Sequence, residues 1–320
     1  MTTQTDTNPS WIRLGSLFVV NDSQTIDLSA FRFTFNVAQA DQESPNNARI
    51  RVYNLADATV ARIKAEFTKV VLQAGYQNGP AGVIFTGTIR WFGAGREDAK
   101  TTYLDLLASD GDLAYNYGFI KQSYAAGTPY SDMLSATVAT MSPYGVTAGQ
   151  QNVEGTGGVL PRGKVLFGLA RARMRGLTRQ VGATWNISGG KVNITALDGY
   201  IPGQAVVLNS DTGLIGRVEQ SVDGMKCTCL INPRIQPGNL LQIDNKSINT
   251  TQASSPLTET GAGLPYDSIS GIQMYASIAG DGLYRVYVVE HEGDSRGQEW
   301  YSHIIGLAVN PVTQKVKSNA

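Results

Sequence analysis

The segment Phe31-Arg32-Phe33-Thr34-Phe35-Asn36-Val37 alternates apolar and polar residues without interruption. Successive side chains of an extended strand point to opposite faces, so the apolar residues share one face and the polar residues share the other. Strands of this kind pack one face on a core and leave the other accessible, as is common in antiparallel sheets. The segment therefore predicts a half-buried strand.

The same alternation recurs in residues 48–52, 192–196 and 225–231. Glycine-containing pairs separate several of these runs, namely Asn78-Gly79, Gly189-Gly190 and Asp223-Gly224. Such pairs tolerate the positive φ angles that tight hairpins require. The pattern predicts a mainly β fold built from antiparallel hairpins.

Segments 58–67, 129–141 and 166–181 instead carry apolar residues at helical spacing. Asp57 is the expected N-cap of the first helix, and Thr128 that of the second, with Pro129 at its first position. The third helix is expected to bury a stripe from Phe167 to Val181.

These helices divide the chain into a strand-rich region 1–111, a mixed α+β region 112–203 and a second strand-rich region 204–320. Segments 142–163 and 247–265 are predicted to be loops or linkers. The length of 320 residues suits two or three units of ordinary size.

The charge balance favours association over free solubility. Lys plus Arg and Asp plus Glu both total 26, and charged residues make up 16% of the chain, against roughly 25% in an average protein. A neutral balance gives no whole-chain argument for binding nucleic acid or anionic membranes. No apolar run approaches the roughly 20 residues of a membrane helix, so no membrane insertion is expected. The polar start, Met1 to Ser10, lacks signal-peptide features and predicts folding in a cytoplasm.

The chain offers few groups for catalysis. Cys227 and Cys229 share one face of a predicted strand, where this spacing disfavours a disulfide, so both are expected to be reduced core residues. His303, the only other histidine, is expected to be a packed or interface residue. His291 lies between Glu290 and Glu292 and is either a general base or metal ligand, or a structural hydrogen-bonding residue. The structural role is favoured because no further ligands are close in the sequence.

Motifs of common enzymes are missing from the sequence. It contains no Gly-x-Ser-x-Gly elbow and no phosphate-binding loop, and no carboxylate pair stands out. We therefore expect no catalytic residues, no cofactor and no metal site.

The marked charge asymmetry is basic, because no acidic residue lies between Glu154 and Asp198. Arg171, Arg175 and Arg179 form a stripe at one-turn spacing on the third predicted helix. The stripe is either a solvated face or a contact surface for an acidic partner. A protein partner is favoured over nucleic acid because no aromatic residue lies between the arginines. The interface candidates are Arg171, Arg175, Arg179, Arg162 and Lys164.

Several segments follow one another in a characteristic order. The first is Ser44-Pro45-Asn46-Asn47-Ala48-Arg49-Ile50-Arg51-Val52-Tyr53-Asn54-Leu55. After a predicted helix come Val71-Leu72-Gln73-Ala74-Gly75-Tyr76, Ile84-Phe85-Thr86-Gly87-Thr88-Ile89 and Ala108-Ser109-Asp110-Gly111. The last ones are Pro237-Gly238-Asn239-Leu240-Leu241-Gln242-Ile243, Gly282-Leu283-Tyr284-Arg285-Val286-Tyr287 and His291-Glu292-Gly293-Asp294-Ser295-Arg296-Gly297-Gln298-Glu299-Trp300. This order resembles the baseplate hub proteins of phage tails over most of residues 11–111 and 160–307.

The resemblance implies two antiparallel β-barrel domains like tail tube subunits, with a mixed α/β domain between them. It implies a homotrimer whose six barrels surround a channel and join the six-fold tail tube to a three-fold central spike. The implied partners are the spike, the tail tube or distal tube protein, other baseplate proteins and the tape measure, with DNA only as passing cargo. The implied location is the tail baseplate of the virion, assembled in the host cytoplasm.

That family has no catalytic residues to transfer, so the segment Gly293 to Gly297 is expected to be a structural turn. Gly293 and Gly297 would permit its backbone, Asp294 would accept local amide hydrogen bonds, and Arg296 would pair with a nearby carboxylate. Trp300 is expected to anchor the last strand in the second barrel.

Three rival functions remain. A tail tube or adaptor subunit would be shorter, with one barrel. A tail-associated peptidoglycan hydrolase would need an acid–base or metal constellation. A carbohydrate-binding protein would need clustered exposed aromatics, for which Tyr115, Tyr117, Tyr124 and Tyr130 are candidates, although packing in the middle region explains them equally well.

Overall fold

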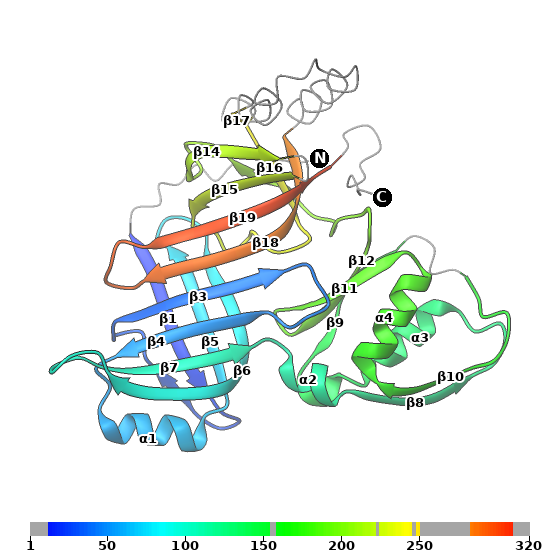
Figure 1. The fold of residues 1–320 in the computed structure, drawn as a ribbon, viewed down its shortest axis with the longest axis horizontal. Helices are drawn as coiled ribbons and strands as arrows, with labels where there is room; N and C mark the ends of the chain where they lie inside the picture. The colour runs from blue at the N-terminus through cyan, green and yellow to red at the C-terminus, as the bar shows by residue number, and fades with distance from the viewer. Residues whose placement is uncertain (1–11, 154–157, 222–223, 245–247, 250–281, 310–320) are drawn as a thin grey trace, which may run out of the picture.

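A computed structural model gives the fold and describes residues 12–153, 158–221, 224–244, 248–249 and 282–309 (Figure 1). Strands dominate these residues, and most helices lie in the middle of the chain, which confirms the predicted mainly β fold. Below, residues 1–111 are called the first β-rich region, 112–203 the middle region and 204–320 the second β-rich region.

The first β-rich region is a bent antiparallel sheet with one helix. Its elements are β1 (Arg13–Val20), β2 (Thr25–Asp27), β3 (Phe33–Ala40), β4 (Asn47–Tyr53), α1 (Asp57–Glu66), β5 (Lys69–Tyr76), β6 (Ala81–Arg96) and β7 (Thr102–Ser109). The hydrogen-bonded order is β3-β4-β7-β6-β5-β1-β2. The long β6 pairs with β5 through its first half and with β7 through its second, so the sheet turns a corner there. As a result, β1 and β5 cross behind β3, β4 and β7 (Figure 1).

The core of this region follows the alternation seen in the sequence. Phe33, Phe35 and Val37 on β3 are buried and pack with the inward residues of β4 and β7. Phe31 differs from the prediction because it lies outside β3 and is 37% exposed. Its backbone N–H donates to the Leu28 carbonyl at 3.1 Å, so the chain is still in a turn at this point.

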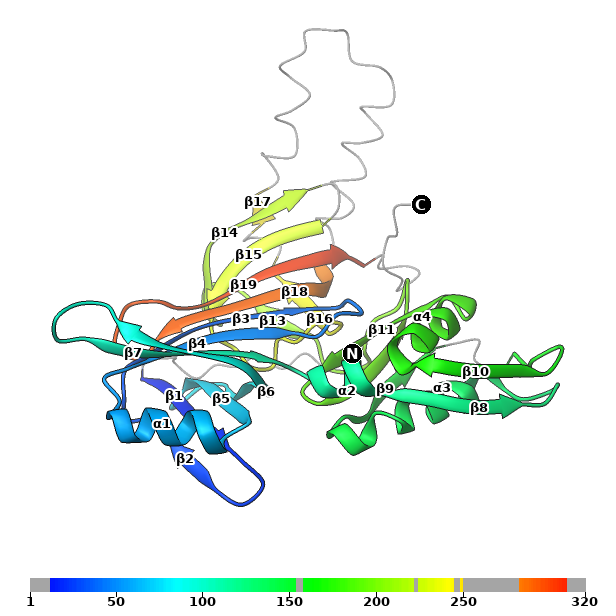
Figure 2. The same cartoon turned by 60° about the horizontal axis from the view of Figure 1, so that its bottom comes forward.

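The middle region has its own core between small sheets and helices. Its elements are α2 (Asp112–Tyr117), β8 (Phe119–Tyr124), α3 (Tyr130–Ala139), the 3₁₀ turn η1 (Ser142–Tyr144), β9 (Thr147–Asn152), β10 (Lys164–Leu169), α4 (Ala170–Gln180), β11 (Ala183–Ser188) and β12 (Lys191–Ala196). β8 pairs with β10, and β12 lies between β11 and β9. Figure 2 shows this region extending to one side of the large sheet.

The second β-rich region continues the large sheet. Its elements are β13 (Val206–Leu208), β14 (Leu214–Ser221), β15 (Gly224–Leu230), β16 (Leu240–Ile243), β17 (Ile248–Asn249), β18 (Leu283–Asp294) and β19 (Trp300–Ala308). The order β17-β14-β15-β19-β18 joins directly onto β3, so both β-rich regions share one sheet. β16 pairs antiparallel with β18 and parallel with β13.

The predicted N-caps of the first two helices were wrong by one residue. The N-cap of α1 is Ala56. Asp57 lies in the first turn, where the positive end of the helix dipole stabilises its carboxylate. The N-cap of α3 is Pro129. Thr128 instead donates from Oγ1 to the Ala125 carbonyl at 2.9 Å and closes the preceding turn.

The third predicted helix begins four residues later than expected, because residues 166–169 belong to β10. Gly168 has a φ of +130°, which is incompatible with an α-helix. Phe167, expected in the buried stripe, is 58% exposed on the face of the β8–β10 pair that points away from the core. Pairing with β8 therefore overrode the apolar spacing.

The predicted turns and loops had mixed outcomes. Asn78-Gly79 joins β5 to β6, and Gly189-Gly190 joins β11 to β12 with positive φ at both glycines. Asp223 and most of 247–265 lie outside the described residues. The prediction of a loop over 142–163 was wrong, since β9 pairs in parallel with β12 there.

Cys227 and Cys229 are buried free thiols in the core of the second β-rich region, as predicted. Burial raises the pKa of the Cys227 thiol to about 12. In the part of the chain that the structure describes, no helix is long and apolar enough to span a membrane.

A buried polar junction joins the three regions. Asp41, just after β3, forms an ion pair with Arg285 of β18, and both side chains are almost completely buried. Asn186 of β11 donates to the second oxygen of Asp41 at 2.6 Å. Arg285 also donates to the carbonyls of Gly199 at 2.8 Å and Leu197 at 3.2 Å. One ion pair therefore contacts all three regions.

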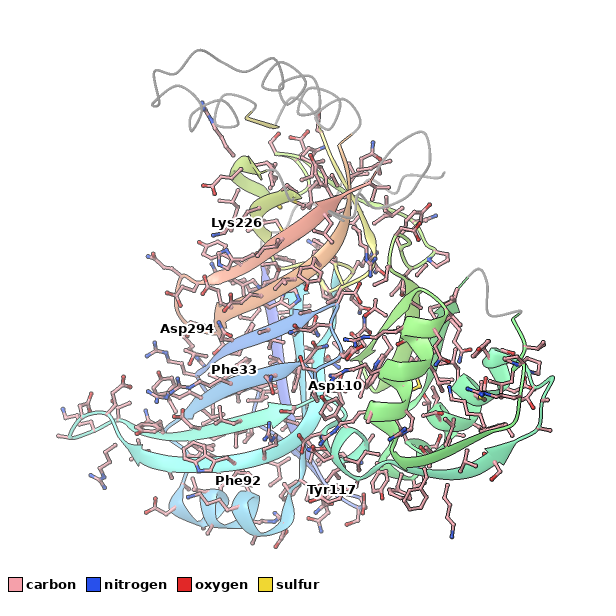
Figure 3. The ribbon with its side chains drawn as sticks, turned by 45° about the vertical axis from the view of Figure 1, so that its right-hand side comes forward. Phe33, Phe92, Asp110, Tyr117, Lys226 and Asp294 are labelled. Carbon is pink, nitrogen blue, oxygen red and sulfur yellow. The ribbon has the colours of Figure 1, made fainter. Side chains whose placement is uncertain are left out.

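The β11–β12 hairpin docks on the first β-rich region next to this junction. Asn46 donates to the Ile187 carbonyl at 2.9 Å, and the Asp110 carboxylate accepts the Gly190 N–H at 3.0 Å. Figure 3 shows Asp110 where the large sheet meets the middle region. Desolvation raises the pKa of Asp110 to about 6, although hydrogen bonds from Gly190 and Gly189 act in the opposite direction.

Replacing Arg285 with Met is expected to destabilise the protein by about 3–5 kcal/mol, because the buried Asp41 charge loses its counter-charge. Adding Asp41→Leu to Arg285→Met should recover part of this loss, since it removes the unpaired charge but leaves the buried Asn186 amide without its acceptor. Urea denaturation measures both effects. Arg175→Met, which removes an exposed arginine paired with Glu43, is the control and should leave the midpoint unchanged. Equal midpoints for Arg285→Met and wild type would contradict the assigned role of the junction.

Asp110 should make stability depend on pH. Because its folded pKa is raised to about 6 from the ordinary 3.8, its contribution is complete below about pH 4 and is lost as pH rises through 6. Between pH 4 and pH 7.5 the unfolding free energy should therefore fall by about 2.5 kcal/mol more in wild type than in Asp110→Asn. Asp98→Asn, at an exposed turn, is the control. The same pH dependence in wild type and Asp110→Asn would refute this prediction.

Candidate functional site

The outer face of the large sheet runs without a break across both β-rich regions. β3 and β18 pair antiparallel from Thr34 opposite Asp294 to Ala40 opposite Val288. Because side chains alternate, the outer face carries Asn36 and Ala38 from β3 beside Glu290 and Glu292 from β18. We call this pairing the seam and the shared surface the outer face.

Polar contacts link neighbouring strands across the outer face. Asn36 donates to Glu290 at 2.5 Å across the seam. His303 of β19 lies between Glu292 of β18, at 2.8 Å from Nε2, and Thr228 of β15, at 3.0 Å from Nδ1. Each contact joins adjacent strands, so together they hold the outer face in register.

On the first β-rich region, the outer face carries the carboxylate of Asp105, which is held by neighbouring arginines. Arg51 of β4 holds Asp105 of β7 through two hydrogen bonds of 2.6 and 2.9 Å, and Arg49 lies 3.6 Å away. The hydrogen bonds from Arg51 hold the pKa of Asp105 below its usual value. The Arg51 guanidinium also stacks over Tyr103, 4.0 Å from the ring centre. These contacts fix charged groups that would otherwise move freely.

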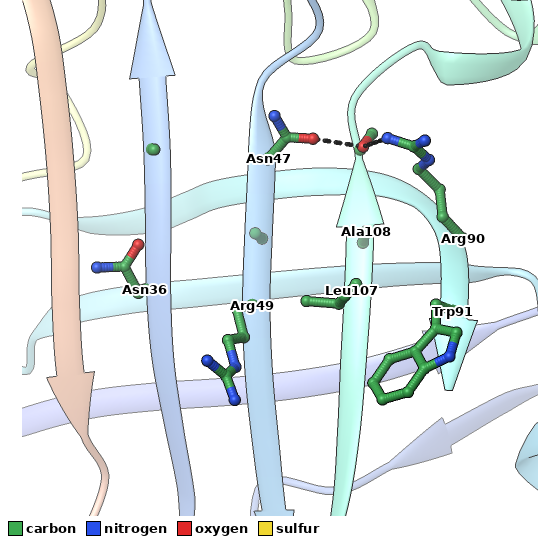
Figure 4. Close-up of a pocket in the computed structure, with 10 residues that line it drawn as sticks. Asn36, Asn47, Arg49, Arg90, Trp91, Leu107 and Ala108 are labelled. Atoms are coloured by element: carbon green, nitrogen blue, oxygen red, sulfur yellow. Dashed lines mark hydrogen bonds between the residues drawn. The ribbon is translucent and has the colours of Figure 1, made fainter. Parts of the chain in front are cut away.

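A shallow hollow of about 470 Å³ opens on the outer face over β3, β4, β7 and β6 (Figure 4). Its lining combines the small side chains of Ala38, Ala48 and Ala108 with the larger ones of Trp91 and Leu107. Ser109 donates to Asn47 at 2.6 Å and accepts from Arg90 at 3.3 Å. The residues that line it include no histidine, cysteine or carboxylate, so the hollow is suited to contact rather than to acid–base chemistry.

The segment Gly293 to Gly297 spans the end of β18 and the start of the turn into β19, and it contacts the first β-rich region. Asp294 accepts the Arg296 N–H at 2.9 Å, and Arg32 binds the same carboxylate at 2.6 Å. Burial alone would raise the pKa of Asp294, but these hydrogen bonds outweigh it and lower the pKa. Arg296 donates to the Ala30 carbonyl at 2.8 Å, where a carboxylate had been expected.

The two glycines of this segment are needed for space. Neither Gly293 nor Gly297 has a positive φ. A Cβ on Gly293 would lie 2.6 Å from Phe35 and 2.7 Å from Trp300, and one on Gly297 would lie 2.5 Å from the Asp294 carboxylate. The two glycines are therefore needed for close packing and not, as expected, for an unusual backbone conformation.

Trp300 begins β19, but its side chain lies in the core of the first β-rich region. It packs edge-to-face on Phe35 with ring centres 5.3 Å apart, against Gly15, and its Nε1 donates to the Gly75 carbonyl at 3.3 Å. Trp300, expected to anchor the last strand in the second barrel, thus reaches across the seam into the core of the first β-rich region.

The predicted basic stripe lies on α4, and two of its members bind within the chain. Arg171 donates to Asn116 at 2.7 Å and lies over the Tyr115 ring at 4.7 Å. Arg175 forms an ion pair with Glu43 of the first β-rich region. Among the described residues, Arg179 has no ion pair or hydrogen bond through its side chain, and the same holds for Arg162. Lys164 donates to Gln180 at 3.1 Å.

His291 is separated from its flanking carboxylates by the alternation of β18. It points into the interior and lies 2.8 Å from Ser302 Oγ, while Glu290 and Glu292 are on the outer face. Desolvation lowers the pKa of His291 to about 4, so it is neutral at physiological pH. Within the described ranges, no three His, Cys, Asp or Glu side chains gather as a metal site would require.

Packing accounts for most of the tyrosines considered for carbohydrate binding. Tyr115 stacks on Trp185 with ring centres 6.3 Å apart, and Tyr124 and Tyr130 pack against the core of the middle region. Tyr117 alone of the four is largely exposed, beside Tyr144 (Figure 3).

Sequence reasoning missed Asp41, Asn186 and the outer-face contacts of Arg51 and Asp105. No local signal marks them, because their partners are brought together only by strand pairing.

No protein-family model matches the sequence, and no curated protein matches it. Solved structures do share the fold. The 43 kDa tail protein of prophage MuSo2 from Shewanella oneidensis matches with a TM-score of 0.57 and 9% identity, covering 96% of this chain and 100% of that one.

A tail protein from Neisseria meningitidis MC58 matches with a TM-score of 0.58 and 9% identity, covering 92% of this chain and 96% of that one. An E. coli component of the type VI secretion system, described as structurally similar to the T4 tail proteins gp27 and gp5, matches with a TM-score of 0.53 and 11% identity, covering 91% and 76%. The chain therefore has the fold of phage tail proteins over nearly its whole length.

Proposed function

We propose that the chain is a structural subunit of a phage tail baseplate hub. Three copies form a ring that joins the six-fold tail tube to the three-fold central spike and lines the channel for genome ejection. The observation that carries this proposal is the continuous outer face, which unites two β-rich regions in one copy. Three copies with two such regions each present six units, which reconciles a three-fold spike with a six-fold tube.

The strand edges support closure of the ring. Along the outer face the order is β14-β15-β19-β18-β3-β4-β7-β6. At one end, β5 pairs only with residues 81–88 of β6, leaving the edge of residues 90–96 open among the described residues. At the other end, β17 pairs with Val218 and Glu219 of β14, and among the described residues the rest of that β14 edge has no partner strand. Pairing β6 of one copy with β14 of the next would cover both edges.

The expected partners follow from this position. They are the central spike, the tail tube or distal tube protein, other baseplate proteins and the tape measure, with DNA passing through the channel. The protein would assemble in the host cytoplasm and remain in the virion. A non-catalytic role is supported by the separation of the neutral His291 from Glu290 and Glu292.

The basic stripe and the three-domain division remain proposals. Because Arg171 and Arg175 already have partners within the chain, Arg179 and Arg162 are the members best able to meet a neighbouring subunit. The division at 111/112 and 203/204 is supported by the middle region's core, whose members fall between Ala114 and Ile194.

Ala94→Pro should prevent trimer formation without unfolding the monomer. The Glu97 N–H donates to the Thr101 carbonyl in the β6–β7 turn. Because successive N–H groups of a strand point to opposite sides, those of residues 92, 94 and 96 point away from β7 to the open edge. Proline at residue 94 therefore removes an N–H available to the neighbouring copy and spares the β7 ladder. Light scattering at micromolar concentration, with and without co-expressed spike protein, should show trimers for wild type and monomers for the variant.

Ala94→Ser keeps the N–H and is the matched control, with circular dichroism to verify the fold. A wild type that stays monomeric under both conditions would contradict the ring. A variant that trimerises normally would contradict only the assigned edge.

A further inference from the structure

The two-stranded sheet of β8 and β10 has one covered face and one bare face. On the covered face, Ile120 and Leu166 join the core of the middle region. Figure 2 shows α3 and α4 close to this pair of strands. On the bare face, Phe119, Val165 and Phe167 are 48%, 67% and 58% exposed. The two phenyl rings meet edge-to-face at 5.2 Å. A cluster of large exposed apolar side chains is typical of a contact surface.

The backbone of this sheet is also open to a partner. The Ala170 N–H donates to the Gly118 carbonyl at 2.8 Å, and hydrogen-bonded pairs alternate along an antiparallel ladder, so Gly168 and Leu166 are the β10 residues whose backbone bonds to β8. The N–H and C=O groups of Val165, Phe167 and Leu169 therefore point away from β8. Neither β8 nor β10 has a second neighbouring strand in the part of the chain that the structure describes. Such an edge is a template for strand addition.

The surroundings of the β10 edge are basic. Arg162 precedes the strand, Lys164 is its first residue, Lys121 lies opposite Phe167, and Arg173 lies beside Gly168. The middle region carries 8 basic and 4 acidic residues, a net charge of +4, which leaves −4 on the rest of the neutral chain. Two copies joined through the same edge would bring like charges together, which disfavours a second copy pairing there.

We propose that the open edge of β10 binds an extended segment of another protein, in which apolar residues alternate with acidic ones. The segment adds as a third strand. Its main chain bonds to Val165 and Phe167, its apolar side chains cover the bare face, and its carboxylates face the surrounding basic residues. This contact lies away from β6 and β14 and does not depend on ring closure.

Synthetic peptides of about ten residues, long enough to span one strand, test the proposal. Fluorescence anisotropy would measure binding of a Val/Glu alternating peptide to the full chain, with a Val/Lys peptide as the charge control. We expect the Val/Glu peptide to bind at least tenfold more tightly. Val165→Pro, which removes an outward N–H, and Phe167→Ser, which removes apolar contact, should each weaken binding at least tenfold.

Val165→Thr keeps the N–H and the branched side chain, and Ile305→Ser removes an exposed apolar residue from the outer face, so both should bind like wild type. Thermal unfolding would verify that the variants fold. Equal binding of the two peptides, or unchanged binding by Val165→Pro, would overturn the proposal. Self-association that the peptide competes with and Phe167→Ser abolishes would identify a second copy as the occupant and also overturn it.

Discussion

The ion pair between Asp41 and Arg285 holds the rest of the molecule in place, because it is buried where the three regions meet. Apolar contacts are non-directional and would tolerate small rotations between the regions. A buried charge pair offsets its desolvation only where its geometry is good and further hydrogen bonds are made. Asn186, Gly199 and Leu197 supply such bonds here, although Arg285 Nε has no partner among the described residues, and these directional contacts tie the three regions together.

That orientation makes the outer face continuous. With Asp41 fixed at the end of β3, its N–H donates to the Tyr287 carbonyl of β18 at 2.8 Å, and the seam continues in register to Asp294. At the far end of the seam, the Trp300 side chain lies in the core of the first β-rich region. Arg32 forms an ion pair with Asp294 just before the turn that leads to Trp300. The two β-rich regions are thus held together at both ends of the seam.

The middle region is attached differently. It has a separate core and contacts the large sheet through the β11–β12 hairpin, whose backbone Asn46 and Asp110 hold, and through the ion pairs Arg175–Glu43 and Asp112–Arg90. The bare face of β8 and β10 lies within this region, away from the seam. The excess of basic residues is also in this region. The chain therefore keeps its proposed ring-forming edges and its proposed partner-binding edge on separate parts of the fold.

Local alternation alone determined which side chains of β3, β4 and β15 face the core, and glycine pairs located the β5–β6 and β11–β12 turns, because both depend on neighbouring residues. The order of motifs was enough to suggest the tail-protein fold. Tertiary structure decided that residues 166–169 form a strand, because Phe167 suits either element and only pairing with β8 distinguishes them. It also decided the partnership of Asp41 with Arg285 and the close packing at Gly293. Those contacts join residues far apart in the chain, where no local periodicity can indicate a partner.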